Sequence, residues 1–246
     1  MSAARIEVLA SATEVARRAA DRISAYLATP APVLGLATGR TPLAVYTALR
    51  DRIATGRLSL AHAICFNLDE YSSLPAVHPA SFESYMRREL FGPVGLPDDR
   101  WHLPDGNGGP GEARSFEAAI TAAGGIGLQL PGIGRNGHIG LNEPGAPHDS
   151  RTRQVRLTEQ TRQANAPDFP ADTAVPEFAV TMGIGTILEA REILLLATGT
   201  AKAEALAAAL QGPVTEAVPA SALQQHSGVT VLCDTAAAQF LHCQAA

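Results

Sequence analysis

The sequence has few cysteines, few charges and no long apolar run, and each shortage excludes a class of protein. Only 3 of its 246 residues are cysteine and none forms a CxxC pair, so we expect neither a disulfide framework nor a Cys/His zinc site. No apolar stretch approaches the roughly 18 residues that suggest a membrane span. The net charge is −5 and its 19 basic residues never form a run longer than two, which excludes an electrostatic surface for nucleic acid. We therefore predict no membrane partner and no nucleic-acid partner.

The compartment follows from the N-terminus and from the cysteines. Arginines interrupt the first 23 residues at helical spacing, so the start has no apolar core of signal-peptide type. We interpret Cys65, Cys233 and Cys243 as reduced thiols of a cytoplasmic protein. Cys65 and Cys233 lie in apolar runs and are expected in the core.

The apolar pattern alternates between two periods, and this alternation predicts the fold class. Short continuous apolar runs are typical of buried parallel strands, and we expect them at 32–37, 61–68, 126–130, 178–182, 193–197 and 229–233. Helical spacing is found at 13–27, 41–53, 79–91, 111–123 and 200–210. Strands that alternate with helices predict one α/β domain with a parallel, helix-covered sheet.

In such a sheet the ligand lies beyond the carboxyl ends of the strands, so the loops after the apolar runs should carry the chemistry. Four of these loops are polar or rich in glycine: 38–41, 67–71, 131–144 and 198–202. We expect the four loops to converge on one site.

Two of the loops are suited to bind an anion. Thr38, Gly39, Arg40 and Thr41 link a strand to a helix, where backbone N–H groups and the helix dipole favour negative charge. A plain strand-to-helix turn with Thr41 as N-cap is the alternative. Lys202 lies in the first turn of a helix, where a cation is unfavourable without an anion nearby, although a solvated surface lysine is as plausible.

The other two loops are suited to proton transfer. Asp69 and Glu70 follow a buried strand, and burial with mutual repulsion raises the pKa of a carboxyl. A solvated acidic turn is the alternative. His138 lies five residues before Glu143 among closely spaced glycines, and a carboxylate can orient and tune an imidazole there. These residues predict an enzyme for acid/base chemistry on a small phosphorylated substrate, by proton abstraction next to a carbonyl or by hydrolysis, without a metal or cofactor.

Several segments together resemble one family. LGLATGRTPLAVYTAL, FNLDEYSSLPAVHPASFESYM, GIGRNGHIGLNEPG and VPEFAVTMGIGTIL are similar to segments of the glucosamine-6-phosphate deaminase (isomerase) family, in a wider group that includes 6-phosphogluconolactonases. The resemblance implies a modified doubly wound, Rossmann-like α/β fold with a mainly parallel sheet and helices on both faces, formed by 1–246 as a single domain. It also implies conversion of glucosamine 6-phosphate and water to fructose 6-phosphate and ammonia.

The resemblance further implies roles for residues of this chain. Asp69 would be the base that takes the C2 proton and returns it at C1, His138 would assist ring opening, and Glu143 would orient His138. The remaining roles concern substrate binding: Thr38, Gly39, Arg40, Thr41 and Lys202 would hold the phosphate, and Gly132 and Gly140 would approach the sugar.

The chain departs from the family pattern at three places. Asn136 stands where the deaminases have an aspartate beside the GHI motif, which changes the tuning of His138 and is closer to the galactosamine-6-phosphate deaminase branch. The arginine that follows the family's TR-x-AN segment is absent here, and we expect Arg40 to supply the missing cation. Val155 replaces a lysine that regulated members use for an effector, which makes allosteric control doubtful.

Alternatives remain for substrate, activity and assembly. Galactosamine 6-phosphate is the second substrate candidate, a 6-phosphogluconolactonase-like hydrolase is a second activity, and a catalytically weakened sugar-phosphate-binding protein is a third. Either a monomer or a homo-oligomer is compatible with the sequence. The polar, proline-containing segment 158–176 is either a lid or a packed surface loop.

Overall fold

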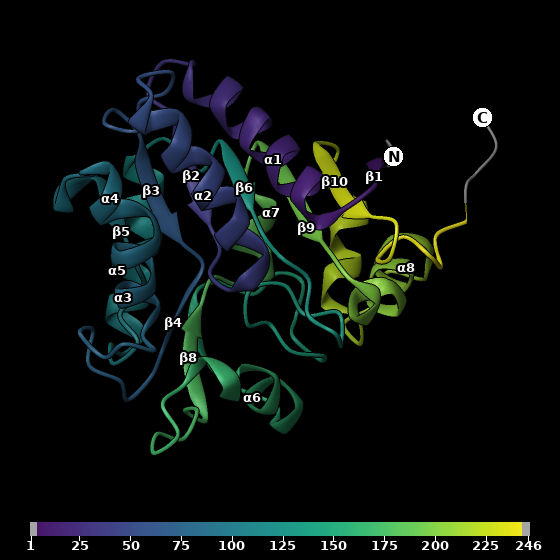
Figure 1. Ribbon diagram of the computed structural model, residues 1–246. Coiled ribbons are helices and arrows are strands. Elements are labelled where there is room, and N and C mark those ends of the chain that lie inside the picture. The colour runs from purple at the N-terminus through teal and green to yellow at the C-terminus, as the bar shows by residue number, and fades with distance from the viewer. Residues whose placement is uncertain (1–3, 243–246) are drawn as a thin grey trace.

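The computed structural model describes residues 4–242 and is built around one seven-stranded parallel sheet (Figure 1). The strand order is β1-β10-β9-β6-β2-β3-β5. In that order the strands comprise Arg5–Leu9, Val229–Asp234, Glu192–Ala197, Leu128–Leu130, Val33–Leu36, Ile64–Asn67 and Trp101–His102. Every pairing in this sheet is parallel, as the alternation of strands and helices predicts. The edge strand β5 has only two residues, and the edge strand β1 has no buried position. The apolar pattern therefore predicted neither strand.

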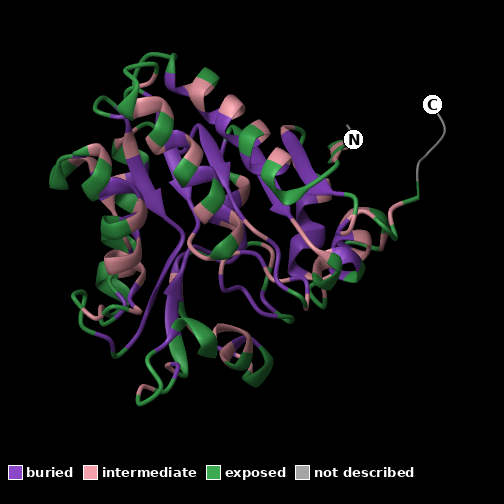
Figure 2. Cartoon of the chain, in the orientation of Figure 1, coloured by how far each residue is buried: buried purple, intermediate pink, exposed green. Residues whose placement is uncertain are grey.

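Helices cover both faces of the sheet because alternate strand residues point to opposite sides. On one face Leu34 and Leu36 pack with the buried stripe of α1 and with α2. On the other face Val33 and Phe66 pack with α5, α7 and α8. These five helices span Ala12–Leu27, Arg40–Ala54, Pro110–Ala122, Ile184–Leu188 and Ala203–Gln211. Figure 2 shows the buried strands between helices whose outer faces are exposed, and this three-layer arrangement confirms the predicted fold class.

A second, antiparallel sheet corrects one prediction. The run 178–182 was expected as a strand of the parallel sheet, but β8 (Phe178–Thr181) lies between β4 (Asp69–Tyr71) and β7 (Arg153–Arg156) in a separate sheet. Only Phe178 of this run is exposed, and β9 (Glu192–Ala197) of the main sheet has the same pattern of one exposed residue followed by buried ones, so the apolar run predicts a buried strand but not the sheet that it joins. With α6 (Glu159–Asn165), β4 and β8 extend below the carboxyl end of the main sheet in Figure 1.

Two predicted helices begin later than expected or change form. The helix predicted for 79–91 begins at Phe82, because the Ser81 hydroxyl accepts a hydrogen bond from the Ser84 backbone N–H and caps it. This helix, α3 (Phe82–Met86), then continues as the π-helical turn η1 (Arg87–Phe91). The helix predicted for 200–210 begins as the 3-10 turn η4 (Thr200–Lys202), so Lys202 precedes α8.

Short helical segments complete the chain. They are α4 (Gly92–Val94), η2 (Asp98–Arg100), η3 (Ala166–Asp168) and η5 (Pro219–Gln225). Cys65 and Cys233 are free thiols in the core, as expected, and Cys243 lies outside the described residues. Within residues 4–242, no helix combines the length and the apolar character that a membrane crossing requires.

Candidate active site

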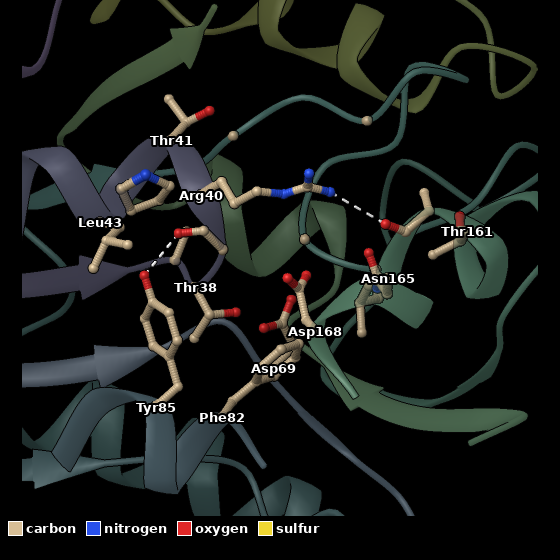
Figure 3. A pocket seen from close by; sticks show the side chains of 18 of the residues that line it. Thr38, Arg40, Thr41, Leu43, Asp69, Phe82, Tyr85, Thr161, Asn165 and Asp168 are labelled. Carbon is tan, nitrogen blue, oxygen red and sulfur yellow. Dashed lines mark hydrogen bonds between the residues drawn. The ribbon is translucent and has the colours of Figure 1, made fainter. Parts of the chain in front are cut away.

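A cavity of about 620 Å³ opens at the carboxyl ends of the central strands. It is bounded by the loops after β2, β6 and β9, by β4, and by the segment that contains α6. Figure 3 labels side chains around it from the loop after β2, from β4 and from the segment that contains α6. The four loops singled out by sequence therefore converge, because parallel strands bring their carboxyl ends to one edge of the sheet.

The loop after β2 forms the first wall. Gly39 has a φ of 101°, a backbone conformation that L side chains rarely adopt, and it turns the chain from β2 into α2. The Tyr85 hydroxyl donates to the Gly39 carbonyl at 2.7 Å, which ties this turn to α3. Thr41 lies inside α2 rather than at its N-cap, and its hydroxyl is 3.2 Å from that of Thr198. The loops after β2 and β9 are thus joined side chain to side chain.

The loop after β9 is held from the neighbouring strand. Both carboxylate oxygens of Asp234, at the end of β10, accept the backbone N–H of Gly199 at 3.0 Å. This contact fixes the turn that leads to Lys202, which lines the cavity. Sequence reasoning gave Asp234 no role, because its partner lies on another strand.

Four cationic side chains line the cavity, and one of them, Arg88, pairs with Glu89. Within the described part of the chain, the other three, Arg40, Arg135 and Lys202, have no carboxylate within 4 Å. Burial, and then the positive charges of Arg135 and Arg40, lower the pKa of Lys202 to about 8. Like charges without counter-ions in the loops after β2, β6 and β9 are suited to bind an anion.

Arg40 also reaches across the cavity. Its guanidinium donates to the backbone carbonyl of Ala164 at 3.2 Å, as Figure 3 shows. Because Ala164 belongs to α6, this single bond links the loop after β2 to the segment 158–176 on the opposite wall.

Asp69 lies on β4 and points into the cavity (Figure 3). It is only 6% exposed, and none of the hydrogen bonds found among residues 4–242 reaches its carboxylate. Burial, and then the charge of Glu70, raise the pKa of Asp69 to about 7. Such a carboxyl can exchange a proton near neutral pH.

Glu70 faces the other way. Its carboxylate accepts backbone N–H groups of Tyr71, Phe82 and Glu83 at 2.7, 3.0 and 2.8 Å. Burial raises the pKa of Glu70 in spite of these bonds. Neighbours on a strand point to opposite sides, so Glu70 caps the start of α3 while Asp69 lines the cavity.

The glycine-rich loop brings His138 to the cavity and Glu143 behind it. The Nδ1 atom of His138 is 3.7 Å from Oε2 of Glu143, too far for a hydrogen bond but close enough for an ion pair when the ring is charged. A Cβ atom on Gly134 would lie 2.3 Å from Cε1 of His138, so only glycine leaves room for the imidazole.

Asn136 contacts the same carboxylate. Its Nδ2 donates to Oε2 of Glu143 at 2.6 Å, and the backbone N–H and hydroxyl of Thr158 donate to Oε1 at 3.2 and 3.1 Å. Burial alone would raise the pKa of Glu143, but His138, Thr161 and Asn136 outweigh it and lower the pKa to about 2. Glu143 is therefore a fixed negative charge behind the imidazole of His138.

The remaining predicted residues Thr38, Gly132 and Gly140 also line the cavity. Lining residues that the sequence did not predict include Phe82, Tyr85 and Asp168 on other elements and Arg135 within the glycine-rich loop itself. For Arg135 the charge within the glycine-rich loop was an available signal. No local sequence pattern marks Tyr85 and Asp168, because only the packing of distant segments turns their side chains toward the cavity.

The described residues contain no group of three or more His, Cys, Asp or Glu side chains placed to hold a metal ion. The arrangement instead combines an anion site, a titratable carboxyl and an imidazole with a fixed carboxylate. These groups can bind a phosphorylated molecule at one end and move protons at the other.

Comparison with known proteins supplies the family context. Residues 8–232 match the family model described as glucosamine-6-phosphate isomerases/6-phosphogluconolactonase. The chain is 53% identical over 214 residues to glucosamine-6-phosphate deaminase of Rhodopirellula baltica, covering 86% of this chain and 85% of that one. It is 46% identical over 213 residues to glucosamine-6-phosphate deaminase 2 of Bacillus subtilis, covering 85% and 86%.

Solved structures agree with the fold. A structure described as a monomeric glucosamine-6-phosphate deaminase superposes with a TM-score of 0.92 at 43% identity, covering 96% of this chain and 99% of that one. A 6-phosphogluconolactonase from Trypanosoma cruzi superposes with a TM-score of 0.73 at 22% identity over 99% of both chains, which shows a shared fold alone.

Proposed function

Because this chain belongs to the glucosamine-6-phosphate isomerase/6-phosphogluconolactonase family, we propose that it converts glucosamine 6-phosphate and water to fructose 6-phosphate and ammonia. One observation carries the proposal: the buried carboxyl of Asp69 shares a cavity with Arg40, Arg135 and Lys202, and among residues 4–242 the carboxyl has no hydrogen-bond partner and the three cations have no counter-ion. A phosphate would satisfy the cations, and a proton on carbon would be transferred by the carboxyl. Galactosamine 6-phosphate remains the second candidate substrate.

The phosphate is proposed to bind at the loops after β2 and β9. Thr38, Gly39 and Thr41 would offer backbone and hydroxyl donors, while Arg40 and Lys202 supply charge. An anion here would stabilise the charged form of Lys202, whose pKa burial and neighbouring arginines lower. Arg135 adds a third cation, so Arg40 need not replace the missing family arginine alone.

Proton transfer is assigned to Asp69. Its ionised form takes the proton from C2 of the open-chain aldose, leaving an enolamine, and returns the proton to C1. The resulting C2 iminium is hydrolysed: water adds to C2 and ammonia leaves. A pKa near 7 suits both steps, because the carboxyl must accept and release a proton at similar pH.

Ring opening is assigned to His138. It would relay a proton from the C1 hydroxyl to the ring oxygen, with Glu143 stabilising the imidazolium. Asn136 orients Glu143 rather than acting as an acid or base, since an amide cannot exchange a proton in this range. Gly132 and Gly140 would let the backbone approach the sugar.

The chemistry needs no cofactor, since every step is a proton transfer or a hydrolysis. The two buried thiols support a reducing, cytoplasmic location. For assembly, the structural relative described as monomeric favours a monomer over a homo-oligomer.

A coupled assay tests the function directly. Ammonia and ketose 6-phosphate are measured with glucosamine 6-phosphate and galactosamine 6-phosphate side by side, without added metal. We expect release of ammonia in equal amount to ketose 6-phosphate. No ammonia from either sugar between about pH 6 and about pH 9 would contradict the proposal, and hydrolysis of a phosphogluconolactone instead would favour the lactonase activity. Binding without turnover would favour the sugar-phosphate sensor.

The base is tested by Asp69→Asn, with Asp51→Asn as matched control because Asp51 is exposed on α2. We expect Asp69→Asn to lower kcat by about 10²–10⁴ while substrate still binds. Turnover close to that of the wild type would show that another group removes the C2 proton.

A further inference from the structure

Two acidic side chains that line the cavity have no part in the steps above, and one of them, Glu89, is paired with Arg50 and Arg88. Asp168 is the last residue of the 3-10 turn η3 and lines the cavity from the segment 158–176. No ion pair or hydrogen bond joins its carboxylate to any other residue of the range 4–242. Figure 3 shows the carboxylates of Asp168 and Asp69 both directed into the cavity.

The position of Asp168 is fixed by its neighbours. Three residues earlier, Nδ2 of Asn165 donates to the hydroxyl of Tyr71 at 2.9 Å. One residue later, the buried ring of Phe169 packs edge-on against Tyr71, with 5.2 Å between ring centroids. Tyr71 thus holds the chain on both sides of Asp168.

Tyr71 also relates this turn to the reacting group. Tyr71 and Asp69 are two residues apart on β4, so their side chains leave the same face of the strand. The turn held by Tyr71 therefore places Asp168 over the face that carries Asp69. Burial is the main cause that raises the pKa of Tyr71, and the negative charges of Asp69 and Asp168 add to it, which agrees with this placement.

The charged side chains of the cavity come from different elements. Arg40, Arg135 and Lys202 belong to the loops after the parallel strands, whereas Asp69 and Asp168 belong to β4 and to the turn η3. The other two, Arg88 and Glu89, pair with each other. A ligand with a phosphate at one end and an ammonium group at the other would match both groups of charges.

We propose that Asp168 binds the ammonium group at C2 of the substrate and so selects amino sugars over sugar phosphates with a hydroxyl there. The inference rests on the proposed function, in which Asp69 takes the proton from C2. The carbon that meets Asp69 also bears the amine, so the ammonium group must lie beside Asp69. Asp69 itself is occupied by proton transfer, and Asp168 is an exposed carboxylate that lines the same cavity and pairs with no group of residues 4–242.

Kinetics with and without the amine test the proposal. KM is measured for glucosamine 6-phosphate, and Ki for glucose 6-phosphate, which has a hydroxyl in place of the amine, in wild type, Asp168→Asn and Asp168→Glu. We expect Asp168→Asn to raise KM about tenfold and to leave Ki within about twofold, because only the charged hydrogen bond to the amine is lost. Asp168→Glu should recover part of the loss.

Asp172→Asn is the matched control, since it removes the same charge from the same segment outside the cavity. An unchanged KM in Asp168→Asn would overturn the proposal. An equal rise of KM and Ki would also overturn it, because Asp168 would then act on the phosphate site through Arg40 or on the segment as a whole.

Two further measurements separate this proposal from the proposed function. If the wild type releases no ammonia, the proposed function is wrong, and the binding measurement that follows still tests Asp168 by itself. In an Asp69→Asn background, calorimetry gives Kd for both sugar phosphates without turnover. A preference for the amine that disappears with Asp168→Asn supports the proposal, and a preference that persists contradicts it.

Discussion

At the residue scale, the site depends on one buried carboxyl and on three cations of the cavity. Among residues 4–242, Asp69 is buried without a hydrogen-bond partner, and Arg40, Arg135 and Lys202 have no counter-ion. Burial of the ionised Asp69 carboxyl costs stability, which a proton relieves, whereas Arg40 and Arg135 are exposed and stay solvated until an anion binds.

The raised pKa of Asp69 predicts a dependence of stability on pH. Its pKa rises from 3.8 to about 7 on folding, so between these values the folded state holds a proton that the unfolded state has released. The free energy of unfolding therefore falls as pH rises from about 4 to about 7, by up to about 4 kcal/mol from this group. Asp69→Asn should remove this fall in the free energy of unfolding. The variant should therefore be more stable than the wild type at pH 8 but not at pH 4.

Urea unfolding at both pH values measures this difference, with Asp51→Asn as an exposed control on α2. A stability difference between Asp69→Asn and wild type that is the same at pH 4 and pH 8 would show that Asp69 ionises in the fold as freely as in the unfolded chain.

The cations predict a loss of affinity specific to phosphate. Arg40→Ala and Arg135→Ala should each raise KM for glucosamine 6-phosphate roughly tenfold and leave binding of unphosphorylated glucosamine unaffected, because the lost contact is to the phosphate. Arg114→Ala, an exposed arginine of α5, is the control and should change neither. If KM stays the same in Arg40→Ala, that residue does not replace the missing family arginine.

At the scale of elements, the helices and central strands were predicted well and the small sheet was not. The buried stripe of α1 has helical periodicity, and β2, β9 and β10 are continuous apolar runs. Both kinds of pattern are local, so they can be read from neighbouring residues. By contrast, β4 has three residues and β7 alternates half-exposed and exposed positions. Such strands gain their stability from partners far away in the sequence, so their own pattern is weak.

The segment 158–176 remains a proposed lid, and its contacts predict how it responds to ligand. Arg40 holds Ala164 across the cavity, and Thr158 holds Glu143. A phosphate that attracts Arg40 and a sugar that fills the cavity should stabilise the segment, so hydrogen exchange in 158–176 should slow when glucose 6-phosphate binds. Mass spectrometry measures the exchange, with α5 as the unaffected reference. Equal exchange with and without ligand would favour a packed surface loop.

At the scale of the whole molecule, the two apolar layers between the sheet and its helices stabilise the sheet, and the sheet positions the loops that form the site. Ile23 is fully buried between α1 and the sheet, far from the cavity lining. Ile23→Ala should lower the free energy of unfolding by about 2–5 kcal/mol and leave KM of the folded enzyme unchanged. Thr13→Ala, exposed on the same helix, should change stability by no more than about 0.5 kcal/mol. Denaturant unfolding and initial rates measure both effects, and a large rise in KM would link α1 to the site.

The sequence by itself determined the layered α/β fold and the loops that carry the chemistry. Apolar periodicity is local, and parallel strands necessarily bring their carboxyl ends to one edge. Only the tertiary structure decided which side chains face the cavity. It turned Asp69 toward the cavity and Glu70 toward the start of α3, and it brought Arg135 and Asp168 to the same cavity. The direction of a side chain depends on packing between segments far apart in sequence, which no local pattern contains.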